Sequence, residues 1–367
     1  MSLSTPHPTD TVPLQISDVR GFHVPGDYVE TDSGTLMSGG IFVEHYRPAK
    51  ILKSAPVVMV HGNWQTAANF TGTPDGRRGW AHDFLRAGYE VYLIDQPARG
   101  RSGNPADLHG LREGKSVEFV EQRFTNAADS KLWPQAAKHT RWPGSGRRGD
   151  PAFDRLYASQ VEALVDRRAT EQLNLAANIK LAEQIGPAIW LTHSQSGPFG
   201  FALADACPDK VLALLSIEPN GPNFHECLMT GEAGGWFRDS EEVVRPLGAG
   251  QLLMNFEPPL PAGQPLPSQR QAKADAPGLV PCHLQTEPAR QLPRLGNLKL
   301  AIVVGEASYH APYDHCTAAF LVQAGVPADL IRLEDRGITG NGHMMMLEQN
   351  NHEIADLLLQ WLSDRRL

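Results

Sequence analysis

A serine in residues 189–197, Ile-Trp-Leu-Thr-His-Ser-Gln-Ser-Gly, has the surroundings of a catalytic nucleophile. An apolar run leads into small residues around Ser194, and a helical pattern follows from Pro198. A strand, a sharp turn and a helix in this order expose a serine hydroxyl at the edge of a parallel sheet. Thr192 and Ser196 occupy the two flanking positions that must be small. Ser196 is the competing nucleophile, but it would put Pro198 at one of those constrained positions, so we prefer Ser194.

A serine hydroxyl is a weak nucleophile near neutral pH, so it needs a base and an acid that orients the base. In this arrangement the acid and then the histidine follow the serine along the chain. Glu218 directly follows the apolar run 212–217 and is our candidate for the acid, whereas Glu306 and Asp314 are its rivals. His343 is our candidate for the base, because it lies in a glycine-rich loop between the last apolar run and the last helical pattern.

The oxyanion that forms during acyl transfer needs two backbone N–H donors that are already in position. We expect one from Gln195, directly after the nucleophile. The other should come from the loop after the apolar run 57–60, where Asn63 and Trp64 are the candidates. Trp64 is also a candidate for the substrate pocket, and so is Met344, although Met344 suits the core equally well.

No motif for a cofactor accompanies these residues. A metal site could be drawn from four neighbouring polar residues that lack the spacing of a recognised ligand set, namely His310, Asp314, His315 and Cys316. We therefore expect neither a metal nor a cofactor. The four cysteines form no C-x-x-C pair and leave one or two disulfides open; they are Cys207, Cys227, Cys282 and Cys316.

Short apolar runs predict the strands that position these side chains. Runs rich in Val, Ile and Leu are typical of parallel strands buried on both faces, and they lie at 57–60, 91–94, 188–191, 212–217, 301–304 and 330–333. Helical patterns separate several of them, at 79–87, 198–206, 316–324 and 352–362. The alternation predicts βαβ units and an α/β fold with a mostly parallel sheet. Two earlier segments, 19–31 and 38–46, are expected to begin the sheet in antiparallel orientation.

Two long connections interrupt this alternation. The first contains a charged, Trp-rich part and a long helical pattern at 153–185, and the second has a Pro-dense centre at 257–281. Connections this long are usually lids or substrate-binding insertions, and we expect both over the strand ends. The predicted organisation is a core of 1–102, 188–218 and 298–367, with a cap insertion and helix at 103–187 and a proline-rich lid at 219–297.

Several motifs resemble those of the α/β-hydrolase superfamily, and most of all a small group of bacterial esterases with a twin-cysteine oxyanion loop. They extend over most of the chain: His61-Gly62, Thr73-Pro-Asp-Gly-Arg with Gly79-Trp80, Asp95-Gln96 with Arg99-Gly-Arg-Ser102, His193-Ser-Gln-Ser-Gly197, Glu218-Pro219 and His343-Met-Met-Met346. The resemblance implies Ser194 as nucleophile, Glu218 as acid and His343 as base. Asn63-Trp64 stands where those esterases carry Cys-Cys, so the substrate range stays open.

Composition and charge narrow the class of protein. The 367 residues include 33 basic and 41 acidic ones, a net charge of −8 with no basic stripe, which argues against nucleic acid as a partner. The longest apolar stretch, 211–217, is far below the roughly 18 residues of a membrane span, so we expect no span. The first eight residues lack the features of a secretory signal, which favours the cytoplasm as written. Removal of a signal peptide would instead favour a secreted or periplasmic protein.

These observations predict a serine hydrolase that cleaves a carboxylic ester or lactone through an acyl-enzyme. A carbon–carbon bond hydrolase or an acyltransferase on the same fold is the alternative. A non-catalytic ligand-binding protein on this scaffold is disfavoured by the intact set of serine, histidine and acid. The expected partner is a small-molecule ester or lactone, and a homodimer stays open.

Overall fold

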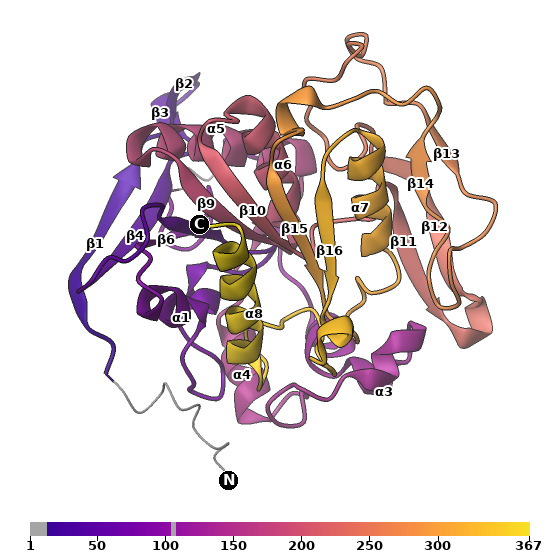
Figure 1. The fold of residues 1–367 in the computed structure, drawn as a ribbon, viewed down its shortest axis with the longest axis horizontal. Coiled ribbons are helices and arrows are strands. Elements are labelled where there is room, and N and C mark those ends of the chain that lie inside the picture. The colour runs from indigo at the N-terminus through magenta and orange to yellow at the C-terminus, as the bar shows by residue number, and fades with distance from the viewer. Residues whose placement is uncertain (1–12, 104–107) are drawn as a thin grey trace.

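A parallel sheet forms the centre of the protein in the computed structural model, which describes residues 13–103 and 108–367 (Figure 1). The strand order is β1-β4-β6-β5-β9-β10-β15-β16. From β6 onward the neighbouring strands are parallel, and they are Val91–Asp95 (β6), Val57–Val60 (β5), Ala188–His193 (β9), Val211–Ile217 (β10), Lys299–Val304 (β15) and Ala328–Arg332 (β16). Each lies within two residues of a predicted strand, so the mostly parallel sheet is confirmed.

The antiparallel edge of the sheet is shorter than the sequence predicts. Ile16–Val24 (β1) pairs with Ile41–Pro48 (β4), and β4 pairs with β6, both antiparallel. The predicted strand 19–31 is wrong beyond Val24, because Pro25 has no N–H to continue the ladder. The chain then forms a separate hairpin from Asp27–Thr31 (β2) and Gly34–Ser38 (β3).

Helices cover both faces of the sheet, as expected for a parallel sheet whose strands are apolar on both faces (Figure 1). Side chains alternate along each strand, so Val57 and Met59 enter one core while Val58 and Val60 enter the other. The first core includes residues of Trp80–Arg86 (α1) and Asn351–Asp364 (α8). The second includes residues of Arg167–Ile185 (α5), Gly197–Ala206 (α6) and Asp314–Gln323 (α7).

The helical pattern at 153–185 is two helices rather than one. Pro151–Ala158 (α4) ends well before α5, and Ala163–Leu164 (β8) lies between them and pairs with Arg112–Glu113 (β7). Asp166 caps α5 by accepting a hydrogen bond from the backbone of Ala169, which fixes a new helix start. The prediction of one continuous helix is wrong, because periodicity alone did not reveal this internal cap.

Each insertion adds short elements of its own. The first also contains Val117–Val120 (α2), a π-helical turn at Glu121–Thr125 and Ala127–Ser130 (α3). The second contains a hairpin of Phe224–Gly231 (β11) and Trp236–Arg245 (β12), and a shorter one of Ser268–Arg270 (β13) and His283–Gln285 (β14). A disulfide between Cys282 and Cys316 joins this second insertion to α7.

Two sequence expectations fall partly outside the described ranges. The first eight residues, on which the cytoplasmic prediction rests, belong to residues 1–12, and residues 104–107 belong to the predicted cap insertion. Among the described helices, none has the length and apolar character that crossing a bilayer requires.

Candidate active site

Ser194 lies at the turn between β9 and α6, with its backbone in the left-handed region at a φ of 55°. A non-glycine residue in this region is strained, and such strain concentrates at functional sites. The start of α6 lies very close to the residue after Glu218, because a Cβ on Gly197 would lie 2.4 Å from Cβ of Pro219. Ser196 is fully buried, and its hydroxyl lies 2.8 Å from the carbonyl oxygen of Val60. Ser194 thus faces a cavity, whereas Ser196 holds the turn.

Glu218 and His343 form a buried pair beside this turn. Glu218 follows β10 directly, and its Oε2 lies 2.5 Å from Nδ1 of His343. The same carboxylate accepts hydrogen bonds from the backbone of Gly305 at 2.7 Å and from the hydroxyl of Ser308 at 2.6 Å. Because Ser308 Oγ also accepts the N–H of His310, its own proton points to Glu218. These two donors favour an ionised carboxylate, and with that form the imidazole proton lies on Nδ1 and Nε2 is an acceptor.

Burial shifts the pKa values of both Glu218 and His343. Burial, with His193 and His310 nearby, holds the pKa of His343 well below its ordinary value, because an imidazolium is poorly solvated there. Burial raises the pKa of Glu218, while His310 and the hydrogen bonds from Ser308 and Gly305 oppose that rise. A neutral imidazole is the form that can take a proton from a serine hydroxyl.

The two rival acids have other partners. Asp314 is buried, and its Oδ1 lies 2.9 Å from Nδ1 of His310. Glu306 forms an ion pair with Lys138 at 2.8 Å and accepts a hydrogen bond from the backbone of Gly340. Neither is hydrogen-bonded to His343 in the described part of the chain. Of the three candidate acids, the structure therefore brings Glu218 to the imidazole.

Tyr309 lies between the serine and the histidine and was missed from the sequence. Its hydroxyl is 3.4 Å from Nε2 of His343, and the Ser194 side chain lies close to it. Burial raises the pKa of Tyr309, so the hydroxyl stays protonated. No direct hydrogen bond joins Ser194 to His343 among the described residues, and such bonds often tighten only when substrate binds. The one available signal was the position of Tyr309 in the loop after β15, at a strand end.

Two backbone N–H groups next to Ser194 have no acceptor among the described residues, those of Asn63 and Gln195. A Cβ on Gly62 would lie 3.1 Å from Cβ of Ser194, so glycine lets the loop after β5 approach Ser194 closely. The N–H of Trp64 donates to the side chain of Asn63 at 3.1 Å. Asn63 therefore has the better placed free donor of the two candidates in this loop.

A buried arginine, Arg99, contacts both segments that carry these two N–H groups. Arg99 is only 4% exposed; its Nη2 donates to Oε1 of Gln195 at 2.7 Å, and its Nη1 donates to the carbonyl of Gly62 at 3.2 Å. Burial lowers the pKa of Arg99 to about 9, so the guanidinium is still charged near neutral pH. The sequence motif that contains Arg99 could not indicate this contact, because Gln195 is distant in sequence.

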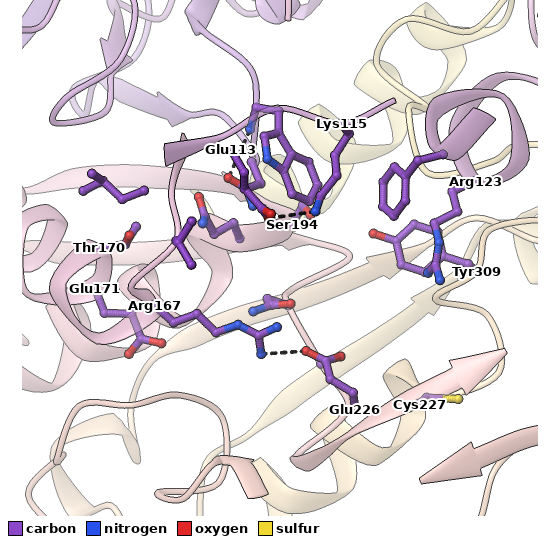
Figure 2. A pocket seen from close by; sticks show the side chains of 18 of the residues that line it. Glu113, Lys115, Arg123, Arg167, Thr170, Glu171, Ser194, Glu226, Cys227 and Tyr309 are labelled. Atoms are coloured by element: carbon purple, nitrogen blue, oxygen red, sulfur yellow. Dashed lines mark hydrogen bonds and ion pairs between the residues drawn. The ribbon is translucent and has the colours of Figure 1, made fainter. Parts of the chain in front are cut away.

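A cavity of about 310 Å³ opens over Ser194 (Figure 2). Residues of both insertions line it together with Asn63, Trp64 and Gln195. Of the two residues proposed for the substrate pocket, Trp64 lies in its wall. Met344 does not; it is fully buried in the core, where its sulfur accepts a hydrogen bond from Gln65. The volume lies at the lower end of the range of ~300–1,000 Å³ for small-molecule sites.

Two groups of side chains have the composition of metal ligands. In Glu218, His310 and His343 the ligand atoms lie within 4.8 Å of one another, but the donors and acceptors described above already engage them. In the second group, Cys282, His315 and Cys316, the two sulfurs are bonded to each other, which removes the thiolates. Neither arrangement has the open geometry of a tetrahedral metal site.

A parallel sheet with helices on both faces, and a strained serine at a strand-to-helix turn, define a class of hydrolases. Residues 57–357 match the model of the alpha/beta hydrolase family, and the chain belongs to this family. The predicted fold is thereby confirmed.

Two known proteins are similar to the chain over most of its length. A "Probable secreted lipase phiG" from Fungal sp. (strain ATCC 74256) is 40% identical over 323 residues, which cover 88% of this chain and 85% of that protein. A solved structure titled as that of a novel bacterial esterase has a TM-score of 0.63 and 23% identity, and covers 99% of both chains. The second likeness concerns the fold, and it bears out the resemblance to bacterial esterases.

Proposed function

We propose that the protein is a serine hydrolase of carboxylic esters or lactones that works through an acyl-enzyme. The observation that carries the proposal is the Glu218–His343 hydrogen bond of 2.5 Å beside the strained Ser194, at the floor of a cavity. A lipase and an esterase among the similar proteins agree with this chemistry.

In the proposed reaction Ser194 Oγ attacks the ester carbonyl carbon while Nε2 of His343 takes the hydroxyl proton. The N–H groups of Gln195 and Asn63 stabilise the developing oxyanion. The carbon–oxygen bond to the alcohol then breaks, and the alcohol leaves with the proton from Nε2. Water attacks the acyl-enzyme in the same way, and the acid is released. Glu218 stays ionised throughout and holds the imidazole in the required tautomer.

Substrate must replace the contact between Tyr309 and Ser194 before attack can occur. The Tyr309 hydroxyl is 3.4 Å from Nε2, so it remains within reach of the position that the leaving oxygen would occupy. We propose that Tyr309 shields the nucleophile in the free enzyme and borders the leaving group in the complex.

We also propose that the protein is exported from the cytoplasm. A disulfide persists in oxidising compartments and is rare in the cytosol, so the Cys282–Cys316 bond favours a secreted or periplasmic protein. The similar fungal lipase is named as secreted. Thiol counting on protein isolated from its own host tests this: two free thiols support export, and four support the cytoplasm.

A panel of esters, lactones and amides tests the proposed function. We expect a burst of alcohol with an activated acetate ester, followed by steady turnover, and neither with Ser194→Ala. Binding without turnover would support a ligand-binding protein instead. Transfer of the acyl group to an added alcohol at the expense of hydrolysis would support an acyltransferase.

A further inference from the structure

Charged side chains are unusually frequent in the wall of the cavity above Ser194, and most of them are paired. They are Glu113, Lys115, Arg123, Arg167, Glu171 and Glu226. Lys115 Nζ lies 2.7 Å from a carboxylate oxygen of Glu113, and Arg167 lies 2.8 Å from Oε1 of Glu226 (Figure 2). Glu226 is also bound by Arg245, at 3.1 Å. Glu171 accepts backbone hydrogen bonds and lies at the opposite end of the view from Arg123.

Arg123 is the exception among the lining cations. In the part of the chain that the structure describes, no carboxylate lies within ion-pair distance of its guanidinium. Two aromatic rings hold it instead, with the guanidinium carbon 5.1 Å from the ring centre of Phe119 and 5.5 Å from that of Tyr309. Such contacts orient a guanidinium without neutralising its charge.

The position of Arg123 ties this charge to the reaction. Figure 2 shows its side chain beside Tyr309, the residue whose hydroxyl contacts both Ser194 and His343. Arg123 comes from the π-helical turn Glu121–Thr125, a local irregularity that is frequent at functional sites. Arg123 thus lines the cavity as a cation without a carboxylate partner among the described residues, and the ring of Tyr309 lies between it and His343.

We propose that the enzyme acts on an ester or lactone that carries a free carboxylate, and that Arg123 binds this carboxylate. The inference rests on the proposed ester hydrolysis and specifies its substrate class. A guanidinium presents parallel N–H donors that match the two oxygens of a carboxylate. The single charge of the Arg123 guanidinium matches the single charge of a carboxylate.

The same geometry disfavours a long, uncharged acyl chain. Such a chain would fill a small cavity whose wall carries three cations and three carboxylates, and it would leave Arg123 without an anion. A charged group in a poorly hydrated wall is stabilised when its counter-ion arrives with the substrate. We therefore expect short substrates with one anionic end.

Matched substrate pairs test the proposal on both sides of the ester. On the alcohol side, 4-acetoxybenzoate is compared with 4-acetoxybenzamide; on the acyl side, mono-4-nitrophenyl adipate is compared with 4-nitrophenyl hexanoate. We expect kcat/KM to favour the anionic member of at least one pair by roughly 10- to 100-fold, since hydrogen bonds to charged groups contribute about 1.5–3 kcal/mol. Equal rates within both pairs would overturn the proposal and leave ester hydrolysis standing.

Variants assign the preference to Arg123. Arg123→Gln should abolish the preference for the anionic member of the pair, and Arg123→Lys should keep part of it. Arg148→Gln, an exposed arginine of the same insertion outside the cavity, is the matched control and should behave as the parent. An equal loss for both members of a pair in Arg123→Gln would mean that Arg123 only supports the fold, and would overturn the assignment.

A binding measurement separates this inference from the proposed chemistry. Titration calorimetry compares 4-hydroxybenzoate with 4-hydroxybenzamide, neither of which can be hydrolysed. Binding of the carboxylate that Arg123→Gln weakens at least tenfold supports the anion site even if every ester in the panel proves inert. Equal binding of the carboxylate to the parent and to Arg123→Gln would refute the site even if esters are turned over.

Discussion

Three residues around the proposed catalytic centre have their backbones in the left-handed region: Trp64 at 59°, Ser194 at 55° and Glu218 at 46°. Each lies just beyond the carboxyl end of a central strand, β5, β9 or β10. Non-glycine residues there cost of order 1–3 kcal/mol each, and the surrounding packing must hold them in place. The strain therefore marks the same three strand ends that bring the proposed oxyanion donor, nucleophile and acid together.

Replacement of the nucleophile is the most direct test at this scale. Ser194→Ala should lower kcat by as much as about a million-fold if the three residues act as a unit, and the fold should survive. A fluorophosphonate probe followed by mass spectrometry should label Ser194 in the parent. Ser196→Ala is the control: it loses the bond to Val60 and some stability, but keeps the labelling. Labelling at Ser196 would reverse the assignment.

The acid is tested by a contrast among three isosteric changes. Glu218 accepts three hydrogen bonds, so Glu218→Gln places an amide against one of the donors and favours the wrong imidazole tautomer, which can cost about 10⁴ in kcat. Asp314→Asn and Glu306→Gln do not touch His343 and should change the rate by less than roughly tenfold, or ~1.4 kcal/mol of barrier. A large loss of kcat in Asp314→Asn together with a small loss in Glu218→Gln would instead assign the role of the acid to Asp314, which pairs with His310.

Among the elements, local sequence patterns predict the sheet and the order of the candidate catalytic residues, but they miss features that depend on distant contacts. The parallel strands and the order of Ser194, Glu218 and His343 could be predicted, because buried strands are continuous apolar runs and the polar residues come after them. The break between α4 and α5 could not, since its apolar residues continue the helical pattern. Tyr309 and Arg123 had no clear signal either, because their roles depend on loops brought together in space.

Helix α5 carries a carboxyl that couples the two insertions. Glu171 is buried in the cavity wall, and its Oε2 accepts hydrogen bonds from the backbones of Gln251 at 2.7 Å and Leu252 at 3.2 Å. Burial raises the pKa of Glu171 from 4.5 to about 7 despite these bonds. Below pH 4.5 the group is neutral in both the folded and the unfolded state. As pH rises toward 7, only the unfolded state ionises freely, so stability falls.

This predicts a pH-dependent gain for Glu171→Gln. The amide oxygen can keep both backbone hydrogen bonds, and the variant has no charge to bury. Its free energy of unfolding relative to the parent should rise between about pH 4.5 and 7, by up to about 3 kcal/mol. Urea unfolding at several pH values measures this, with the exposed Glu183→Gln on the same helix as control. A difference that does not vary with pH would contradict the burial argument.

For the whole molecule, the insertions are secured to different parts of the core. The first is bound to the loop that carries His343, since Thr140 N–H donates to Gly340 and His139 lies 2.7 Å from Glu348. The second is bound to α7, where Gln285 and Gln323 exchange hydrogen bonds at 2.9 Å and 3.0 Å. The two insertions that line the cavity over Ser194 are therefore attached to different parts of the core.

The Cys282–Cys316 disulfide is the covalent part of this attachment, and its removal should loosen the second insertion. It closes a loop with a sequence separation of 34 residues, and loss of such a bond typically costs about 2–5 kcal/mol, in part because the unfolded chain gains freedom. The cystine also packs with Tyr313 and Cys227, which line the cavity.

We therefore expect a reductant to lower the Tm of the parent, and the double variant Cys282→Ala with Cys316→Ala to melt at the lower temperature with or without reductant. Cys207→Ala, which removes a free thiol, should respond to reductant as the parent does. KM for a small ester should rise in the double variant more than kcat falls, because Tyr313 and Cys227 belong to the wall while Glu218 and His343 are held by other contacts. If mass spectrometry shows the bond reduced and the Tm of the parent is unchanged, the second insertion is held by its packing and hydrogen bonds alone.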